Sequence, residues 1–167
     1  TAFWGATIVK YDRNRENREE IGKAIAQKHN ATIVPPFDDI NVIIGQGTAG
    51  IECLEQFEEI NVIPDIVLCC CGGGGLIAGI GTAIKTKFEK SKIYSVEPEN
   101  FDDTKKSLEK NEIVPNSMKY KSICDALLAE KPGNITFNIN KLNLTSGVSV
   151  SDNEALIAMN TAYKHYK

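Results

Sequence analysis

The clearest pattern of apolar and polar residues lies near the middle of the chain. Residues 65–71 hold apolar side chains in a run without alternation, which indicates a strand with both faces buried. Residues 76–86 have the apolar spacing of a helix, and residues 92–97 predict a second strand. Together the three segments predict a βαβ unit, in which a helix joins two parallel strands.

A smaller alternation of strands and helices precedes this unit. Residues 5–11 are rich in β-branched side chains and predict a strand. Residues 17–29 predict a helix, whose C-terminal lysine and histidine suit the negative end of the helix dipole. Residues 31–34 predict another strand, which ends at two consecutive prolines. We therefore expect a β-α-β arrangement here, with a domain boundary near Asp38.

The remaining segments continue the alternation. The glycine-rich residues 45–48 lead into a predicted helix that ends near Glu59, with its glutamates mostly on the outer side. Ser151 and Glu154 form a capping-box pattern for a final helix through Tyr163. The other predicted elements are a short helix from Asp102 or Asp103 to Lys110, a turn or short helix over residues 122–129 and a strand over residues 148–150. This order predicts an α/β fold with a largely parallel sheet.

The composition is that of an ordinary folded protein and excludes several classes. Of the 167 residues, 42% are hydrophobic and 25% are charged, which is typical of globular domains. The net charge of −3 gives no electrostatic reason to expect a nucleic acid or membrane partner. We find no apolar run of membrane-spanning length and no signal-peptide pattern. The five cysteines form no C-x-x-C pair, so we expect buried thiols in a reducing cytoplasm rather than a zinc site.

Four consecutive glycines, Gly72, Gly73, Gly74 and Gly75, follow the first strand of the central unit. Each glycine costs extra backbone entropy on folding, so such a run is expected where a Cβ would push something away. At the start of a helix that partner is typically an anion, because free N–H groups and the helix dipole both favour negative charge. The run therefore predicts a phosphate site. The alternative is a tight strand-to-helix turn, for which fewer glycines would suffice.

The same segment also fits a weaker pattern. Gly73, Gly75 and Ala78 match G-x-G-x-x-A, and Glu97 ends the next strand, where dinucleotide-binding folds keep an acid for the ribose. An NAD-binding dehydrogenase is therefore an alternative of a different reaction class. A phosphate-binding or regulatory module without catalysis is a third.

Several motifs occur in one order along the chain and together suggest a family. They are Pro35-Pro36-Phe37-Asp38-Asp39, Gly45-Gln46-Gly47-Thr48, Gly72-Gly73-Gly74-Gly75-Leu76, Glu97-Pro98, Ile123-Cys124-Asp125 and Val150-Ser151-Asp152. Over essentially its whole length the chain resembles the pyridoxal-phosphate-dependent threonine/serine dehydratases and the related serine racemases. The resemblance implies a two-domain enzyme of fold type II, with residues 1–38 in the small α/β domain and residues 39–167 in the large cofactor-binding domain.

The resemblance also implies an activity. The family eliminates water from L-threonine or L-serine, and the resulting enamine is hydrolysed to a 2-oxo acid and ammonia. The family's racemases invert serine. The family's cofactor-binding lysine would lie upstream of Thr1, and the hydroxyl group that meets the pyridine nitrogen would lie beyond Lys167. We therefore expect this chain to be a fragment that is inactive alone. The whole protein is expected to be a cytoplasmic homo-oligomer that binds a small amino acid.

Two groups of site residues follow from the resemblance. The N–H groups of Gly72, Gly73, Gly74, Gly75 and Leu76 would hold the phosphate of pyridoxal 5'-phosphate. The carboxylates of Glu97 and Asp103 and the backbone carbonyl of Phe101 would bind a divalent cation, Mg²⁺ or Ca²⁺, since both prefer oxygen ligands. The alternative is that Asp103 caps a helix and Glu97 only ends a strand.

A third group would face the substrate. Arg18 and Glu19 match an Arg-Glu pair that faces the active site in serine racemases, although a solvated cluster of charges would have the same sequence. Asp125 and Ala126 stand where relatives have Asp-Gly in a loop near the substrate. Alanine tolerates a positive φ poorly, so Ala126 is expected to constrain that loop.

Overall fold

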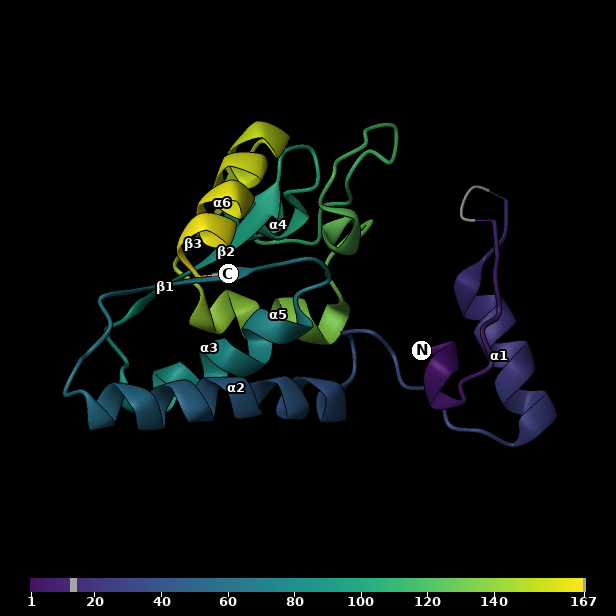
Figure 1. The fold of residues 1–167 in the computed structure, drawn as a ribbon, viewed down its shortest axis with the longest axis horizontal. Coiled ribbons are helices and arrows are strands. Elements are labelled where there is room, and N and C mark those ends of the chain that lie inside the picture. The colour runs from purple at the N-terminus through teal and green to yellow at the C-terminus, as the bar shows by residue number, and fades with distance from the viewer. Residues whose placement is uncertain (13–14, 167) are drawn as a thin grey trace. The chain divides into compact units, whose positions relative to one another are not determined.

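The computed structural model describes residues 1–12 and 15–166 and shows an α/β chain with two compact units (Figure 1). The first unit comprises residues 1–34, and the second begins at Pro35. Asp38, near which a domain boundary is predicted, lies within the second unit. The assignment of residues 1–38 and 39–167 to two domains of a larger enzyme stays a prediction.

The first unit contains the short 3₁₀ helix η1 (Ala2–Trp4) and the helix α1 (Arg18–His29). The predicted helix is confirmed, and the side chain of Asn17 caps it by accepting from the N–H groups of Glu19 and Glu20. The strands predicted at residues 5–11 and 31–34 are wrong, because the described residues of both segments are irregular. A strand must pair its N–H and C=O groups with a neighbour, and the described part of this unit contains no sheet.

The second unit contains a parallel sheet, as predicted. Its described strands are β1 (Ile66–Cys70), β2 (Lys92–Pro98) and β3 (Ser146–Val150), in the order β1-β2-β3, and both pairings are parallel. The helices are α2 (Ile40–Glu59), α3 (Gly75–Lys87), α4 (Asp103–Lys110), η2 (Asp125–Leu127), α5 (Asn134–Asn143) and α6 (Asp152–His165). No helix in the described ranges has both the length and the apolar character needed to cross a membrane.

One face of the sheet carries the core, and the other is exposed in this chain. Cys69 and Cys71 point to the core face, where they join Ile77, Ile84 and Ile93. On the opposite face, the side chain of Leu68 is 63% exposed. The prediction that both faces of the first strand are buried is therefore wrong for this chain. The strand lies at an edge of the sheet, and its second face is left without a complete cover.

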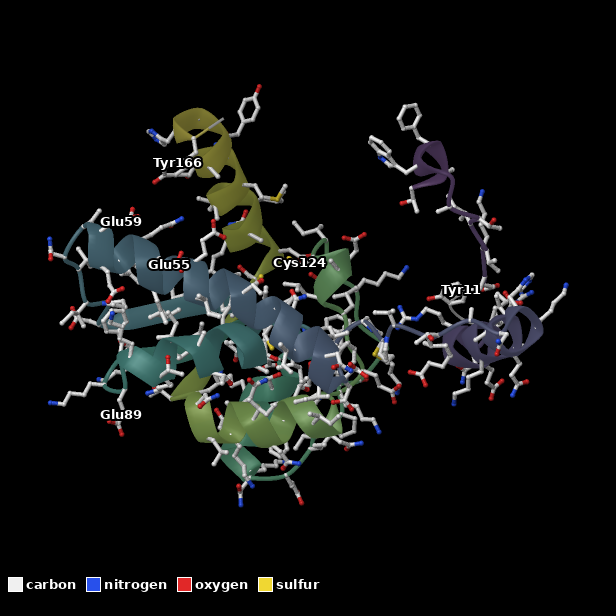
Figure 2. All side chains as sticks on the ribbon, turned by 90° about the horizontal axis from the view of Figure 1, so that it is seen from below. Tyr11, Glu55, Glu59, Glu89, Cys124 and Tyr166 are labelled. Atoms are coloured by element: carbon white, nitrogen blue, oxygen red, sulfur yellow. The ribbon has the colours of Figure 1, made fainter. Side chains whose placement is uncertain are left out.

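The helix α2 begins earlier than the sequence predicts. It starts at Ile40, where the side chain of Asp39 accepts from the N–H groups of Asn41 and Val42. Glycines at residues 45–48 suggest a loop, but they lie inside the helix, where α2 packs on α3. The glutamates do lie on the outer side, and Figure 2 shows Glu55 and Glu59 on α2.

Close packing explains the glycines of these two helices. A Cβ atom on Gly79 of α3 would lie 2.5 Å from the backbone nitrogen of Gly47 and 2.5 Å from the carbonyl oxygen of Ile43 in α2. A Cβ atom on Gly50 would lie 2.7 Å from the Cβ atom of Ala83. The glycines therefore let the two helix backbones approach each other directly.

The last strand, η2 and α6 are confirmed. Ser151 and Glu154 form the predicted capping box, in which the Ser151 hydroxyl accepts from the Glu154 N–H and the Glu154 carboxylate accepts from the Ser151 N–H. The helix α4 is confirmed, although Asp102 at its N-cap makes no side-chain cap. The helix α5 is not predicted, because asparagine, threonine and isoleucine dominate it and are weak helix formers.

We predict that Gly79→Ala lowers the free energy of unfolding by about 1–3 kcal/mol, because the new methyl group must displace backbone atoms of α2. The matched control is Gly45→Ala, since a Cβ atom there has open space, and it should be neutral or raise stability by up to about 1 kcal/mol. Urea unfolding followed by circular dichroism measures both. Equal effects of the two substitutions would contradict the close approach of α2 and α3.

Candidate functional site

The loop between β1 and α3 leaves a row of backbone donors without protein partners. The N–H groups of Gly72, Gly73, Gly74, Gly75 and Leu76 donate no hydrogen bond within the described part of the chain. Gly74 is the N-cap of α3 and has a φ of 92°, a left-handed conformation that favours glycine. The donors therefore gather at the positive end of the α3 dipole.

This helix start differs from all the other α-helix starts that the structure describes. Side chains at the N-caps of α1, α2 and α6 accept from the first N–H groups of those helices. The starts of α4 and α5 lack such a cap, but Glu97, at the end of the preceding strand, accepts from N–H groups of α4, and the distant Asp38 accepts from those of α5. Among the α-helices that the structure describes, only α3 has no side-chain acceptor, so its donors are available to an anion from outside the protein.

A cavity of about 190 Å³ opens over this row of donors. None of the described residues that line it carries a charged side chain, so no carboxylate repels an anion there. Its lining comprises Pro36, Phe37, Cys70, Cys71, the four glycines, Leu76, Ile77, Ala126 and Leu127. Burial raises the pKa of the Cys71 thiol, and the nearby charge of Glu97 adds to this effect, so the thiol stays neutral.

Close contacts with other residues of the protein explain why these positions are glycines, and the sequence alone does not reveal those contacts. A Cβ atom on Gly73 would lie 2.3 Å from the ring of Phe37, and one on Gly75 would lie 2.9 Å from the Cα atom of Phe37. A Cβ atom on Gly74 would lie 2.8 Å from the side-chain nitrogen of Asn140. The surfaces that exclude side chains here thus include the protein's own residues, and the N–H groups remain open.

Asp38 is a structural part of this region that the sequence analysis missed. One oxygen of its carboxylate accepts from the N–H of Ile135 at 2.8 Å and of Thr136 at 3.2 Å, and the other accepts from the N–H of Asn134 at 2.9 Å. The carboxylate therefore caps α5 from a segment that lies 97 residues before Ile135 in the chain. The helix breaker Pro132-Gly133 just before Asn134 was the available signal for a helix start.

Two of the predicted cation ligands, Glu97 and Asp103, lie close enough to interact electrostatically, but Glu97 already has a structural role. Both oxygens of the buried Glu97 carboxylate accept hydrogen bonds, from the N–H groups of Thr104 at 2.8 Å and Lys105 at 2.9 Å and from the hydroxyl of Ser95 at 3.1 Å. Glu97 thus caps α4, which was the role considered for Asp103.

Asp103 differs from Glu97 in having a free oxygen. Its side chain is fully buried, one oxygen accepts from the amide of Asn116, and the other has no partner in the structure. Burial raises the pKa values of Glu97 and Asp103 to about 7 each, and the charge of Glu97 also raises that of Asp103. The third predicted ligand, Phe101, is also buried and lies two residues before Asp103 in the chain. We find no group of three or more His, Cys, Asp or Glu side chains suited to a metal within the described ranges, and the cation site stays a prediction.

The predicted substrate residues fall in two places. Arg18 and Glu19 are the exposed first residues of α1 in the first unit. Asp125 and Ala126 begin η2 in the second unit, where Asp125 is exposed and Ala126 lines the cavity beside the glycines. Ala126 has no positive φ, and its constraint on the loop stays a prediction.

The geometry also bears on the alternative of a dinucleotide site. That alternative needs the carboxylate of Glu97 to meet ribose hydroxyl groups. The side chain is 0% exposed, and three donors from the protein occupy its oxygens. The carboxylate of Glu97 is therefore not available to bind a ribose, and the dehydrogenase interpretation loses the residue on which it depends.

The chain is similar over nearly its whole length to known proteins. The sequence profile of the family described as "Pyridoxal-phosphate dependent enzyme" matches residues 1–167. The chain is 36% identical to the L-threo-3-hydroxyaspartate ammonia-lyase of Saccharomyces cerevisiae, over 95% of this chain and 47% of that protein. It is 36% identical to the serine racemase of Schizosaccharomyces pombe, over 93% of this chain and 47% of that protein.

A solved structure shows the same likeness in three dimensions. The threonine deaminase from T.th. superimposes with a TM-score of 0.85 and 37% sequence identity, over 88% of this chain and 50% of that chain. The chain thus spans about half the length of the curated relatives that it matches.

We predict that Asp38→Ala destabilises α5 by about 1–2 kcal/mol, because three N–H groups lose their acceptor. Hydrogen exchange at residues 134–136 should become faster. The exposed Asp65→Ala is the control and should change stability by less than about 0.5 kcal/mol. Unchanged exchange in the Asp38 variant would show that another group caps α5.

We predict that, in the presence of a chelator, stability falls as the pH rises from 5 to 8. The pKa values of Glu97 and Asp103 are raised to about 7 in the folded protein but lie near 4 when unfolded, so the folded state binds more protons in this window. Their stabilisation is complete below the unfolded values and is lost as the pH passes through the folded values. The expected loss is on the order of 1–3 kcal/mol in urea unfolding.

Asp103→Asn is the test of this assignment, because the amide cannot ionise. The variant should lose less stability between pH 5 and 8 than the unsubstituted protein. The same slope in both proteins would show that other groups cause the pH dependence.

Proposed function

Because this chain belongs to the family of pyridoxal-phosphate-dependent enzymes, we propose that it carries the cofactor-phosphate site of an ammonia-lyase that acts on L-threonine or L-serine. The observation that carries the proposal is the row of unpartnered N–H groups from Gly72 to Leu76, which faces an uncharged cavity at the start of α3. Since the chain spans about half of its curated relatives, the activity is proposed for the whole protein.

The residues present fit the phosphate of this cofactor. The five N–H groups would hold the phosphate oxygens, and the α3 dipole would stabilise their negative charge. Phe37 fixes the other side of the glycine loop, so the donors need little rearrangement on binding. Pyridoxal phosphate, when bound, supplies an electron sink for negative charge at the substrate α-carbon. This chain's own contribution is to anchor and orient that group.

The names of the relatives support the substrate class. Serine, threonine and 3-hydroxyaspartate, which appear in those names, all carry a hydroxyl group on the β-carbon. Elimination of water from such an amino acid gives an enamine. The enamine tautomerises to an imine, and hydrolysis of the imine consumes one water and releases ammonia and a 2-oxo acid. Serine racemisation is the second candidate, and it is supported by the relative from Schizosaccharomyces pombe.

Further site residues belong to the same proposal. We place Asp125 and Ala126 near the substrate because Ala126 lines the cavity. Arg18 and Glu19 are proposed as substrate-facing on the resemblance alone. The free oxygen of Asp103 supports a structural Mg²⁺ or Ca²⁺ ion, with Phe101 and Glu97 as the other proposed ligands.

The direct test uses the whole protein that contains this chain. It should show the absorbance of a pyridoxal-phosphate Schiff base, and it should release a 2-oxo acid from L-threonine, L-serine or L-threo-3-hydroxyaspartate. Formation of D-serine without a 2-oxo acid would favour the racemase. A protein that shows no such absorbance and binds NAD would overturn the proposal.

We also predict that a negative charge at position 76 weakens cofactor binding. Leu76 lines the cavity and is 36% exposed, so a longer polar side chain fits there. Leu76→Glu should weaken pyridoxal-phosphate binding roughly tenfold through repulsion of the phosphate. Without the cofactor it should leave stability unchanged or slightly higher, because a carboxylate suits a helix start.

Leu76→Gln is the matched control for this prediction, since it has the same size and no charge. Its affinity for pyridoxal phosphate should be within about threefold of that of the unsubstituted protein, as expected for a change without charge repulsion. Equal affinities of the Glu and Gln variants would place the phosphate elsewhere.

A further inference from the structure

We infer that Thr136 and Asn140 of α5 are positioning residues, which turn the glycine-loop N–H groups toward the cofactor phosphate. The inference deepens the proposed function and rests on it. Both side chains are completely buried, and neither lines the cavity. They act on the carbonyl side of the loop, opposite to the groups that would bind the anion. In Figure 1, α5 lies beside α3, and the two helices are in contact.

Thr136 holds the peptide unit between Gly73 and Gly74. Its hydroxyl donates to the carbonyl oxygen of Gly73 at 2.7 Å, and the N–H of Gly133 donates to the same oxygen at 3.2 Å. A peptide unit is planar and trans, so its C=O and N–H bonds point in opposite directions. When α5 holds the Gly73 carbonyl, the Gly74 N–H must therefore point away from α5.

Asn140 does the same for the next peptide unit. Its side-chain amide donates to the carbonyl oxygen of Gly74 at 3.2 Å, and the N–H of Ala78 donates to that oxygen at 3.0 Å. The N–H of Gly75 belongs to this unit and is turned away in the same manner. Two successive donors thus point to one side of the loop.

The loop needs such restraint because of its composition. Glycine reaches many backbone conformations, and a free run of four would sample several peptide orientations. Gly74 is held at a φ of 92°, although no side chain caps the helix at this position. The energetic cost of Asn140 also points to a function, because its side-chain oxygen is buried without a partner. An apolar residue would avoid that cost but would not donate to Gly74.

The segment that contains Phe37 and Asp38 fixes the position of α5. The carboxylate of Asp38 accepts from the first N–H groups of α5, including that of Thr136. The neighbouring Phe37 packs on Gly73 and Gly75. One short segment therefore sets both the helix that holds the loop carbonyls and the ring that covers the loop.

The test measures the affinity of the whole protein for pyridoxal phosphate and for pyridoxal, which lacks the phosphate. Thr136→Val keeps the shape of the side chain and removes the hydroxyl group. It should weaken pyridoxal-phosphate binding roughly five- to tenfold, the effect of one lost hydrogen bond, and leave pyridoxal binding within about twofold. The phosphorus-31 resonance of the bound cofactor should also shift or broaden.

Two further variants keep the test decisive. Thr136→Ser retains the hydroxyl group and should restore the preference for pyridoxal phosphate, which a loss of packing alone would not predict. Thr86→Val is the control, because it removes a hydroxyl that donates to a carbonyl within α3, away from the loop. Should Thr136→Val not fold, Thr136→Ala removes the same hydroxyl group without adding a methyl group near the loop.

The possible results distinguish the positioning role of Thr136 from the proposed phosphate site on which it rests. If the unsubstituted protein binds pyridoxal as tightly as pyridoxal phosphate, the proposed phosphate site is wrong. If it prefers pyridoxal phosphate and the Val or Ala variant keeps the same preference and the same phosphorus-31 signal, the site stands and the positioning role is wrong. A preference that falls in the Val or Ala variant and returns in the Ser variant supports both.

Discussion

At the start of α3, five neighbouring N–H groups have no acceptor within the part of the chain that the structure describes, and the surrounding residues keep them open. An unpaired backbone donor is unfavourable wherever water reaches it poorly, and the other described α-helix starts avoid this with a side-chain oxygen. At α3 the N-cap is a glycine, which has no side chain to offer. The start of α3 therefore leaves its N–H groups for an acceptor from outside the protein, and in the proposed function that acceptor is an anion.

Two carboxylates organise the elements around this start. Asp38 accepts from α5, and Glu97, at the end of β2, accepts from α4. The Asp38 contact fixes α5 relative to a segment far away in the chain, and the Glu97 contact ties α4 to the end of the neighbouring strand. Among the α-helix starts that the structure describes, that of α3 is therefore the one whose N–H groups remain open.

The sequence predicted those elements whose signals are local. The capping box at Ser151, the parallel strands and the glycine turn that begins α3 were found because neighbouring residues carry the whole pattern. The helix α5 was missed because its cap, Asp38, lies in another segment and its own residues favour a helix weakly. The start of α2 was misplaced because its glycines serve contact with α3, which only the folded chain shows.

The strands predicted in residues 5–11 and 31–34 failed for a related reason. Their β-branched residues suit a strand, but a strand forms only when a neighbour pairs with its backbone. The described residues of the first unit offer no such neighbour.

In the glycine loop of residues 72–75, one arrangement suits both folding and the proposed phosphate binding. Its carbonyl groups are bound to the protein, by Thr136 and Asn140, while its N–H groups remain free. Because the donors are already oriented before binding, little conformational entropy is lost when an anion arrives. An anion that binds the folded state and not the unfolded chain also stabilises the fold. If the proposed site is right, the same unpaired donors that make this helix start unfavourable on its own couple the stability of the protein to the presence of the phosphate that binds them.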